Sequence, residues 1–173
     1  MRKCLVTGGA GFIGSHLVEA LIRRGDTVTV IDDESTGTRE NLASVWGHSR
    51  LRYQRGTVAD PRLLSEAIAE ADQVYHLAAA VGVALIAQSA IRTIETNIEP
   101  TRQLLAEAAG NHAAGRPVKL FLASTSEVYG KNPKPAWSED DDLVLGATVR
   151  PRWSYGASKA IDEFLALAHW QEH

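Results

Sequence analysis

The stretch TGGAGFIG at residues 7–14 decides the fold, because it joins two different hydrophobic patterns through a glycine-rich turn. Before it, KCLVT (Lys3–Thr7) is a short apolar run of the kind that forms a strand buried on both faces. After it, Phe12–Arg24 carries apolar residues at helical spacing and stops at Gly25. The segment therefore predicts a strand, a tight turn and a helix in direct succession.

Three glycines in such a turn have a physical reason. One allows the tight turn, one lets the backbone approach a pyrophosphate, and one lets helix and strand pack closely. Asp32 ends the second predicted strand, 18 residues after Gly14, and no arginine follows it directly. Its carboxylate can accept hydrogen bonds from an adenosine ribose and would repel a 2′-phosphate, so we expect NAD rather than NADP. The alternative is a glycine-rich turn beside an exposed acidic residue, with no ligand.

The rest of the chain continues the alternation of strands and helices. Further strands are predicted at Thr27–Asp32, Leu51–Gly56, Gln73–Leu77 and Lys119–Ala123. Further helices are predicted at Pro61–Glu70, Ile86–Ala109 and Tyr155–His169. Asp60 is expected to cap the helix that begins at Pro61, and Pro100 is expected to kink or split the long helix. This alternation predicts an α/β fold with a parallel sheet covered on both faces.

Composition narrows the class of protein. The 173 residues include 18 Lys and Arg against 21 Asp and Glu, a formal net charge of −3, which disfavours nucleic acid or an anionic membrane as the main partner. The single cysteine, Cys4, excludes an internal disulfide, and burial as an inert residue is expected for it. The six histidines are scattered, so no metal site is expected. With neither a signal peptide nor a long apolar run, we expect one cytoplasmic domain over residues 1–173.

Two later segments carry groups that can do chemistry. Tyr155 and Lys159 in YGASK are four residues apart on a predicted helix and so share a face. The lysine ammonium is expected to lower the pKa of the tyrosine, which would then act as general base on an alcohol. STSEVYG (residues 124–130) follows the fifth strand at the ligand-binding edge of a parallel sheet, where Thr125 could bond the substrate oxygen and Glu127 could act as a second acid or base. In a sequence that lacked the glycine turn, a tyrosine and a lysine at this spacing would be interpreted as an ordinary surface pair.

Together these motifs resemble the extended short-chain dehydrogenase/reductases that act on nucleotide sugars, among them 4-epimerases, 4,6-dehydratases and glucuronate decarboxylases. The resemblance covers nearly the whole chain and rests on TGGAGFIGSHL, IDDESTG, HLAA, Asn97, STSEVYG and YGASK. It implies a Rossmann-type, doubly wound parallel sheet of about five strands in the order 3-2-1-4-5. It also implies oxidation of the sugar 4′-hydroxyl group of a UDP- or dTDP-linked sugar to a ketone, with NAD bound throughout.

The resemblance also implies a role for individual residues. The pyrophosphate would contact Gly8, Gly11, Phe12, Ile13 and Gly14. The ribose would be held by Asp32, with the adenosine near Ser35, Thr36 and Gly37. The adenine would lie near Thr57 and Val58, and the cofactor would be lined by Leu77, Ala78, Ala79 and Asn97. The catalytic set would be Thr125, Glu127, Tyr155 and Lys159, of which Tyr155 and Lys159 would also contact the cofactor.

Some features depart from the family pattern. Thr57 stands where members usually carry an aspartate that meets the adenine, and Thr125-Ser126-Glu127 is more similar to the glucuronate decarboxylases and some epimerases than to the dehydratases. Members also continue past the tyrosine helix into a substrate-binding part. The 173 residues of this sequence are expected to lack that part. A homodimer through the helices at Ile86–Ala109 and Tyr155–His169 is implied. Two alternatives remain open: an NAD-binding or dimerising module without turnover, and a simple short-chain alcohol dehydrogenase.

Overall fold

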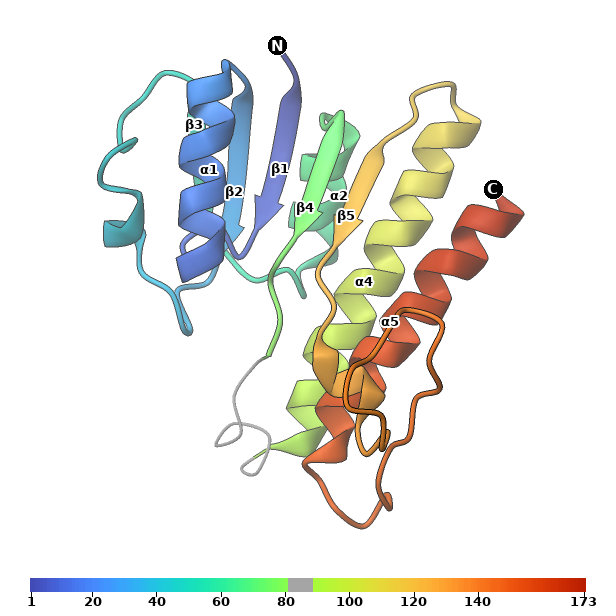
Figure 1. Cartoon of the computed structure of the whole chain (residues 1–173). Helices are drawn as coiled ribbons and strands as arrows, with labels where there is room; N and C mark the ends of the chain where they lie inside the picture. Colours follow the sequence, from blue (N-terminus) through green and yellow to red (C-terminus); the bar gives the residue numbers. More distant parts are fainter. Residues whose placement is uncertain (81–88) are drawn as a thin grey trace. The chain divides into compact units, whose positions relative to one another are not determined.

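The computed structural model describes residues 1–80 and 89–173 (Figure 1). The elements, in chain order, are β1 (Lys3–Thr7), α1 (Phe12–Arg24), β2 (Thr27–Asp32), η1 (Arg39–Leu42), β3 (Leu51–Arg55), α2 (Pro61–Ala69), β4 (Gln73–His76), α4 (Ala90–Ala113), β5 (Lys119–Leu122), η2 (Ser126–Tyr129) and α5 (Trp153–Glu172). The predicted bounds of β1, α1 and β2 are confirmed, and β3, β4 and β5 each end one residue earlier than predicted.

The chain divides into two compact units, each of which is described by itself. The sheet unit consists of Met1–Ala79, Gln103–Ala123 and His173, and the helical unit consists of Ala80–Arg102 and Ser124–Glu172. The boundary between them falls inside α4, so that helix contributes residues to both. None of the helices in residues 1–80 and 89–173 is long and apolar enough to cross a membrane.

The sheet unit contains a five-stranded sheet in the order β3-β2-β1-β4-β5 (Figure 1). Every pair of neighbouring strands is parallel, which confirms both the predicted class and the predicted strand order. Thr7, Asp32 and His76 are the last residues of β1, β2 and β4. Because the carboxyl ends of parallel strands meet at one edge, these three residues share the edge at which ligands bind in such sheets.

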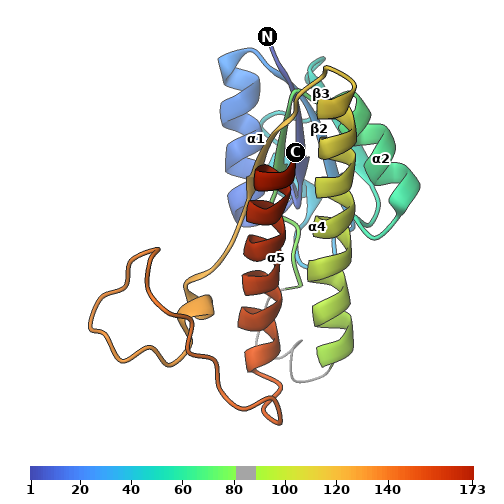
Figure 2. The same ribbon diagram turned by 90° about the vertical axis from the view of Figure 1, so that its right-hand side faces the viewer.

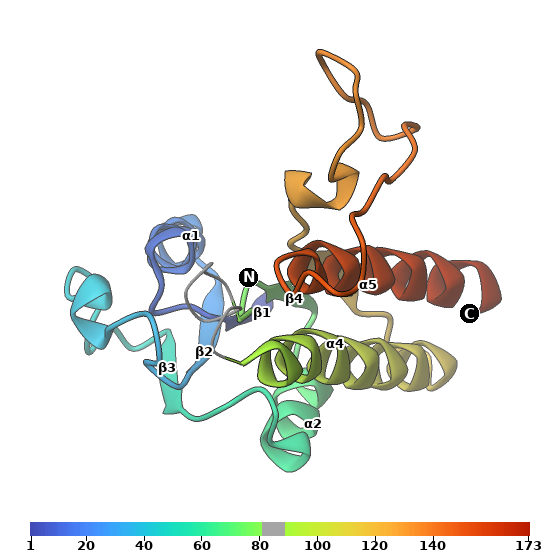
Figure 3. The ribbon, with the colours of Figure 1, turned by 90° about the horizontal axis from the view of Figure 1, so that it is seen from below.

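Apolar side chains cover both faces of the sheet. On one face, α1 packs against alternate residues of β1 and β2, in a cluster of Cys4, Val6, Val18, Leu21, Ile22, Val28, Val30 and Leu42. On the other face, α2 and the second half of α4 pack against the intervening residues, in a cluster of Leu5, Ile31, Val58, Leu64, Ile68, Val74 and Leu104. Figure 3 shows α1 and α2 on opposite sides of the strands. The predicted burial of Cys4 is confirmed, at 3% exposed.

Local sequence signals explain where the first helices begin and end. Gly25 ends α1 in the left-handed region, with φ of +97°, which favours glycine. The Asp60 side chain accepts hydrogen bonds from the backbone N–H groups of Arg62 and Leu63, at 3.0 and 3.2 Å. Pro61 follows at the first helical position, where its missing N–H is no loss. The predicted cap and start of α2 are therefore confirmed.

The long helix differs from its prediction. It begins at Ala90, while the predicted residues 86–88 lie outside the described residues, and it ends at Ala113 rather than Ala109. The prediction that Pro100 splits the helix is wrong, because α4 runs unbroken through it; a kink there stays a prediction. A proline removes one backbone hydrogen bond, and the fully buried Leu104 one turn later anchors the continuation of the helix in the core.

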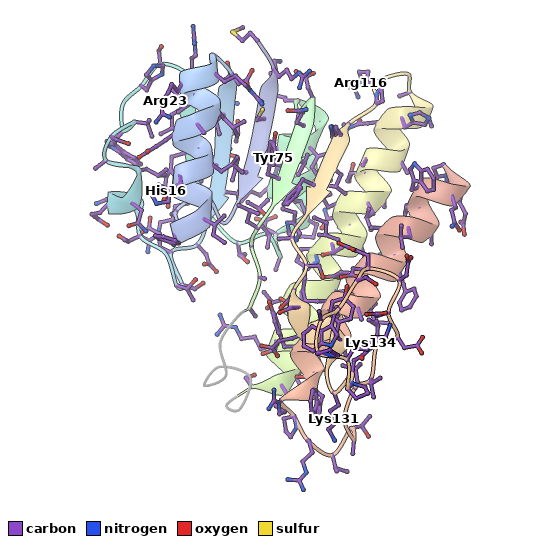
Figure 4. All side chains as sticks on the ribbon, viewed as in Figure 1. His16, Arg23, Tyr75, Arg116, Lys131 and Lys134 are labelled. Carbon is purple, nitrogen blue, oxygen red and sulfur yellow. The ribbon has the colours of Figure 1, made fainter. Side chains whose placement is uncertain are left out.

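In the helical unit, the first half of α4 and α5 lie side by side (Figure 2). The Asn97 amide of α4 donates to the hydroxyl of Ser158 of α5 at 3.0 Å. The segment between η2 and α5 is irregular, apart from a bridge between Gly130 and Val144. Lys131 of this segment is labelled in Figure 4. Its ammonium nitrogen lies over the ring of Trp153, the first residue of α5, 5.5 Å from the ring centroid.

Candidate functional site

The turn between β1 and α1 leaves no room for a side chain at two of its glycines. Gly8 has φ of +71°, and a Cβ there would lie 2.8 Å from the backbone nitrogen of Ala78. A Cβ on Gly14 would lie only 2.1 Å from the carbonyl oxygen of Gly8. The Gly8 N–H donates to the Ile31 carbonyl at 2.9 Å, which fixes the turn against the end of β2. Backbone, rather than side chains, therefore forms the surface of the turn.

The N-terminus of α1 is suited to bind an anion. Gly11 caps the helix without a side chain, and the first turn carries no acidic residue. The N–H groups and the positive end of the helix dipole are therefore not compensated by a carboxylate within the helix. Phe12 and Ile13, which open the helix, are 80% and 69% exposed, an unusual state for large apolar side chains. The donors, the charge and the missing side chains together fit a pyrophosphate.

Asp32 is tied to this turn. One carboxylate oxygen accepts from the Ala10 N–H at 2.9 Å, and the other accepts from the Glu34 N–H at 2.8 Å. The side chain is almost fully buried, so its orientation is fixed. Each carboxylate oxygen can accept a further hydrogen bond, since an ionised carboxylate has about four lone-pair sites. The geometry fits a group that receives two hydroxyls of a ribose.

The adenosine-side residues lie close to the same turn. A Cβ on Gly37 would meet the Ala10 carbonyl oxygen at 2.6 Å, so the Ser35–Gly37 segment runs directly against the turn. Thr57 uses its hydroxyl to accept from the Ala59 N–H at 3.2 Å. Val58 belongs to the core cluster under α2, so its side chain is committed to packing. Any contact from this position to a ligand must come from its backbone.

The segment after β4 is anchored to β1 by two buried polar groups. The Thr7 hydroxyl and His76 Nδ1 are 2.8 Å apart, and the Ala78 N–H donates to the same hydroxyl at 3.2 Å. Both Thr7 and His76 are buried. This anchoring places Leu77, Ala78 and Ala79 beside the glycine turn. The sequence pattern gives no sign that Thr7 takes part.

In the helical unit, Tyr155 and Lys159 lie on one buried face of α5, at 8% and 3% exposed. The Lys159 ammonium donates to the Asp162 carboxylate at 2.9 Å, and the two side chains form an ion pair. Asp162 is a residue that the sequence motifs did not single out. Its signal in the sequence is its spacing, three residues after Lys159 on the same helix.

The electrostatics of Tyr155 differ from the expectation. Burial raises the pKa of its phenol; a hydrogen bond with the Thr125 side chain opposes this, and the carboxylates of Glu127 and Asp162 raise the pKa further. In the chain without ligand the pKa of Tyr155 therefore shifts in the direction opposite to the one expected. Burial of the phenol is the largest cause, and the Lys159 ammonium, which would oppose it, is paired with the Asp162 carboxylate.

The remaining predicted residues of the helical unit have defined surroundings. Thr125 caps η2 by accepting from the Glu127 N–H at 3.3 Å, and Glu127 itself is exposed. A Cβ on Gly156 would meet the Glu127 carbonyl oxygen at 2.7 Å, so this glycine lets η2 approach the start of α5. Asn97 accepts from the Ala80 N–H at 2.8 Å and donates to Ser158, so its amide already has a partner on each side.

The predicted site residues thus form two groups. The sheet unit brings together the glycine turn, Asp32, the Ser35–Gly37 segment and the Leu77–Ala79 segment. The helical unit brings together Thr125, Glu127, Tyr155 and Lys159, with Asp162 added. The first group fits a dinucleotide by its backbone and charge, and the second offers a proton acceptor with neighbours that tune it.

The chain is similar to known proteins along its whole length. The family model described as GDP-mannose 4,6 dehydratase matches residues 5–173. The UDP-N-acetyl-alpha-D-glucosaminuronate decarboxylase of Bacillus cytotoxicus is 40% identical over 168 residues, which cover 97% of this chain and 50% of that protein. The dTDP-glucose 4,6-dehydratase of Streptomyces griseus is 41% identical over 174 residues, covering 98% of this chain and 50% of that protein. The chain spans about half the length of these curated relatives.

Solved structures show the same likeness. A double mutant of the dTDP-glucose 4,6-dehydratase DesIV from Streptomyces venezuelae, with NAD and DAU bound, superposes with a TM-score of 0.84 at 35% identity, covering 99% of this chain and 52% of that one. The UDP-N-acetylglucosamine 4-epimerase from Methanobrevibacter ruminantium, in complex with UDP-N-acetylmuramic acid, also has a TM-score of 0.84, at 32% identity, covering 96% of this chain and 50% of that one.

Proposed function

The chain belongs to the GDP-mannose 4,6 dehydratase family, and we propose that it binds NAD and takes part in oxidising the 4′-hydroxyl group of a UDP- or dTDP-linked sugar. The observation that carries the proposal is the glycine turn, in which a Cβ on Gly14 would lie 2.1 Å from the Gly8 carbonyl oxygen. A turn that excludes side chains, at a helix N-terminus without a side-chain cap, is suited to the close approach of a pyrophosphate.

The proposed cofactor site is built mainly from backbone. The N–H groups at the start of α1 receive the pyrophosphate, and Asp32 receives the adenosine ribose. The Asp32 carboxylate is held on both sides by backbone donors, so it cannot turn away from a 2′-phosphate, and NAD is favoured over NADP. When bound there, NAD supplies a nicotinamide ring that accepts a hydride from carbon 4′ of the sugar.

Tyr155 is the proposed proton acceptor. Its phenolate oxygen takes the proton of the 4′-hydroxyl group as the hydride leaves the same carbon, so that the alcohol becomes a ketone. Thr125, whose side chain bonds Tyr155, stabilises the phenolate by donating its hydroxyl proton. Lys159, which donates to Asp162, is also proposed to donate to the nicotinamide ribose. Glu127, exposed on η2, is proposed to serve as acid or base in the step that follows the oxidation.

A titration by calorimetry tests the cofactor assignment. The chain should bind NAD at one site and NADP at least tenfold more weakly, and Asp32→Ala should lose affinity for NAD and narrow the difference between the two. Asp33→Ala, which removes the neighbouring exposed carboxylate, is the matched control and should keep the parental preference. Equal affinity of the parent chain for both dinucleotides, or no binding of either, would contradict the assignment.

Calorimetric titration with sugars and alcohols, together with an assay of oxidation, separates the proposed enzyme from its two alternatives. Binding of a UDP- or dTDP-sugar to the NAD-loaded chain supports the proposed oxidation. NAD binding with no sugar binding supports a binding module without turnover. Binding and oxidation of simple alcohols in place of nucleotide sugars supports a simple short-chain alcohol dehydrogenase.

A homodimer is part of the proposal. α5 carries four exposed apolar side chains at spacings of three, namely Ile161, Phe164, Leu167 and Trp170, which are 45 to 79% exposed. Such a stripe on one helix fits a second helix of the same kind. Sedimentation should show a dimer for the parent chain and a monomer for Phe164→Glu. Val149→Glu, at an 81% exposed residue outside α5, should leave the dimer intact, and a parent chain that sediments as a monomer would contradict this part of the proposal.

A further inference from the structure

The ion pair between Lys159 and Asp162 is unusually well buried. The two side chains are 4% and 0% exposed, and the ammonium nitrogen lies 2.9 Å from one carboxylate oxygen. Two charges removed from water lose much of their hydration free energy, and their mutual attraction does not always compensate for it. Replacing such a pair by apolar side chains is often neutral or stabilising. Its presence on a helix face that could be apolar therefore points to a role beyond stability.

The carboxylate of Asp162 is only half satisfied within the described residues. One oxygen accepts from Lys159, while the other is buried without a hydrogen-bond partner. The Thr101 hydroxyl donates to the Asn97 carbonyl at 2.9 Å, and the Thr101 side chain also helps to lower the pKa of Asp162. Burial raises the pKa of Asp162, and the hydrogen bond from Lys159 is the strongest effect that opposes it. The charge of Asp162 thus depends on Lys159.

Both partners lie close to Tyr155. Lys159 follows it by four residues and Asp162 by seven, so all three share one face of α5 over two turns. Tyr155 also faces Glu127 and Thr125 from η2. Three of these neighbours are ionisable, and two of the three are carboxylates. A lone ammonium at the position of Lys159 would favour the phenolate, whereas an ammonium already paired with a carboxylate favours it much less.

We infer that Asp162 is a positioning residue: its carboxylate fixes the Lys159 ammonium one turn from Tyr155 and cancels most of its charge, so that the buried phenol keeps its proton in the chain without cofactor. The inference rests on the proposed function, because it takes Tyr155 as the proton acceptor. Activation of the tyrosine then requires a positive charge other than that of Lys159. Asp162 acts through Lys159 and touches no reacting atom.

The test uses the 173-residue chain without cofactor or substrate, labelled with ¹³C at the Cζ atom of tyrosine. The Tyr155 signal is assigned by its loss in Tyr155→Phe and followed by NMR from pH 7 to pH 11. Asp162→Asn should lower the pH midpoint of the Tyr155 titration by about one unit or more, because the Lys159 ammonium is then uncancelled. Glu163→Gln makes the same charge change at the next residue and should leave the midpoint where it is.

If Asp162→Asn does not fold, a double variant still tests the inference. Lys159→Met combined with Asp162→Asn removes both charges, leaves no unpaired ion, and should titrate within about 0.3 units of the parent if the two charges cancel. A midpoint for Asp162→Asn equal to that of the parent, including no titration in either up to pH 11, overturns the inference. A shift of a full unit in the double variant also overturns it. Because the readout needs no cofactor, a chain that failed to bind NAD would contradict the proposed function and leave this result standing.

Discussion

Gly14→Ala should reduce the affinity for NAD by at least about 100-fold, which corresponds to about 2.7 kcal/mol of binding free energy. A methyl group at this position would lie 2.1 Å from the Gly8 carbonyl oxygen and 2.8 Å from the Gly9 Cα atom. Both neighbours are backbone atoms of the turn itself, so they cannot move aside as a flexible side chain would. The turn must open instead, and its N–H groups lose the geometry that a pyrophosphate requires. Calorimetry with NAD measures the loss, and a denaturant titration should show a loss of about 1–3 kcal/mol in the free energy of unfolding.

Gly110→Ala is the matched control for this variant. Gly110 lies inside α4, and a Cβ there would meet nothing within 4 Å. Since glycine in a helix costs about 0.5–1 kcal/mol relative to alanine, this substitution should stabilise the chain by that amount and leave NAD affinity unchanged. The two glycine substitutions should therefore change stability with opposite signs. Parental NAD affinity in Gly14→Ala would show that the pyrophosphate binds elsewhere.

Tyr155→Phe should slow oxidation of a UDP- or dTDP-sugar by about 10²–10⁴-fold, the usual contribution of a general base, while NAD still binds. The ring is 8% exposed, and phenylalanine preserves its packing, so the variant removes little besides the phenol oxygen. Formation of reduced NAD after mixing the NAD-loaded chain with the sugar measures the rate.

Tyr75→Phe provides the control for the loss of a phenol. Tyr75 is on β4 in the sheet unit, and its hydroxyl donates to the Gln73 side chain at 3.3 Å. This variant should oxidise the sugar at the parental rate. If Tyr155→Phe did so as well, Tyr155 would not be the proton acceptor. A parent chain that binds NAD without oxidising any nucleotide sugar would favour the module without turnover.

The sequence predicts most of the sheet unit, because its signals are local. The glycine turn, the apolar runs and the cap formed by Asp60 and Pro61 each fix an element within a few residues, and the strand order follows from the family resemblance. The errors arise where tertiary packing outweighs a local preference. Pro100 ought to interrupt a helix, yet α4 continues because the next turn is anchored in the core through Leu104.

The candidate site is also only partly predictable, because its electrostatics depend on tertiary packing. The spacing of Tyr155 and Lys159 gives their common face, but the direction of a pKa shift depends on burial and on every charge nearby. Two acidic residues, Asp162 and Glu163, follow the lysine, and spacing alone does not say which one is buried with it. In the structure, Asp162 pairs with Lys159, while Glu163 accepts a hydrogen bond from Ser124. The pairing that cancels the lysine charge therefore has no signature in the motif.

The double tethering of Asp32 has a practical meaning for cofactor engineering. The residue at position 32 both discriminates between the two dinucleotides and serves as a backbone clamp, since its oxygens accept from Ala10 and Glu34. A single substitution intended to admit a 2′-phosphate would release the Ala10 amide at the same time. A redesign toward NADP must therefore supply a replacement acceptor for that amide, for example from a side chain in the Ser35–Gly37 segment, or the new specificity will come with a loosened phosphate loop.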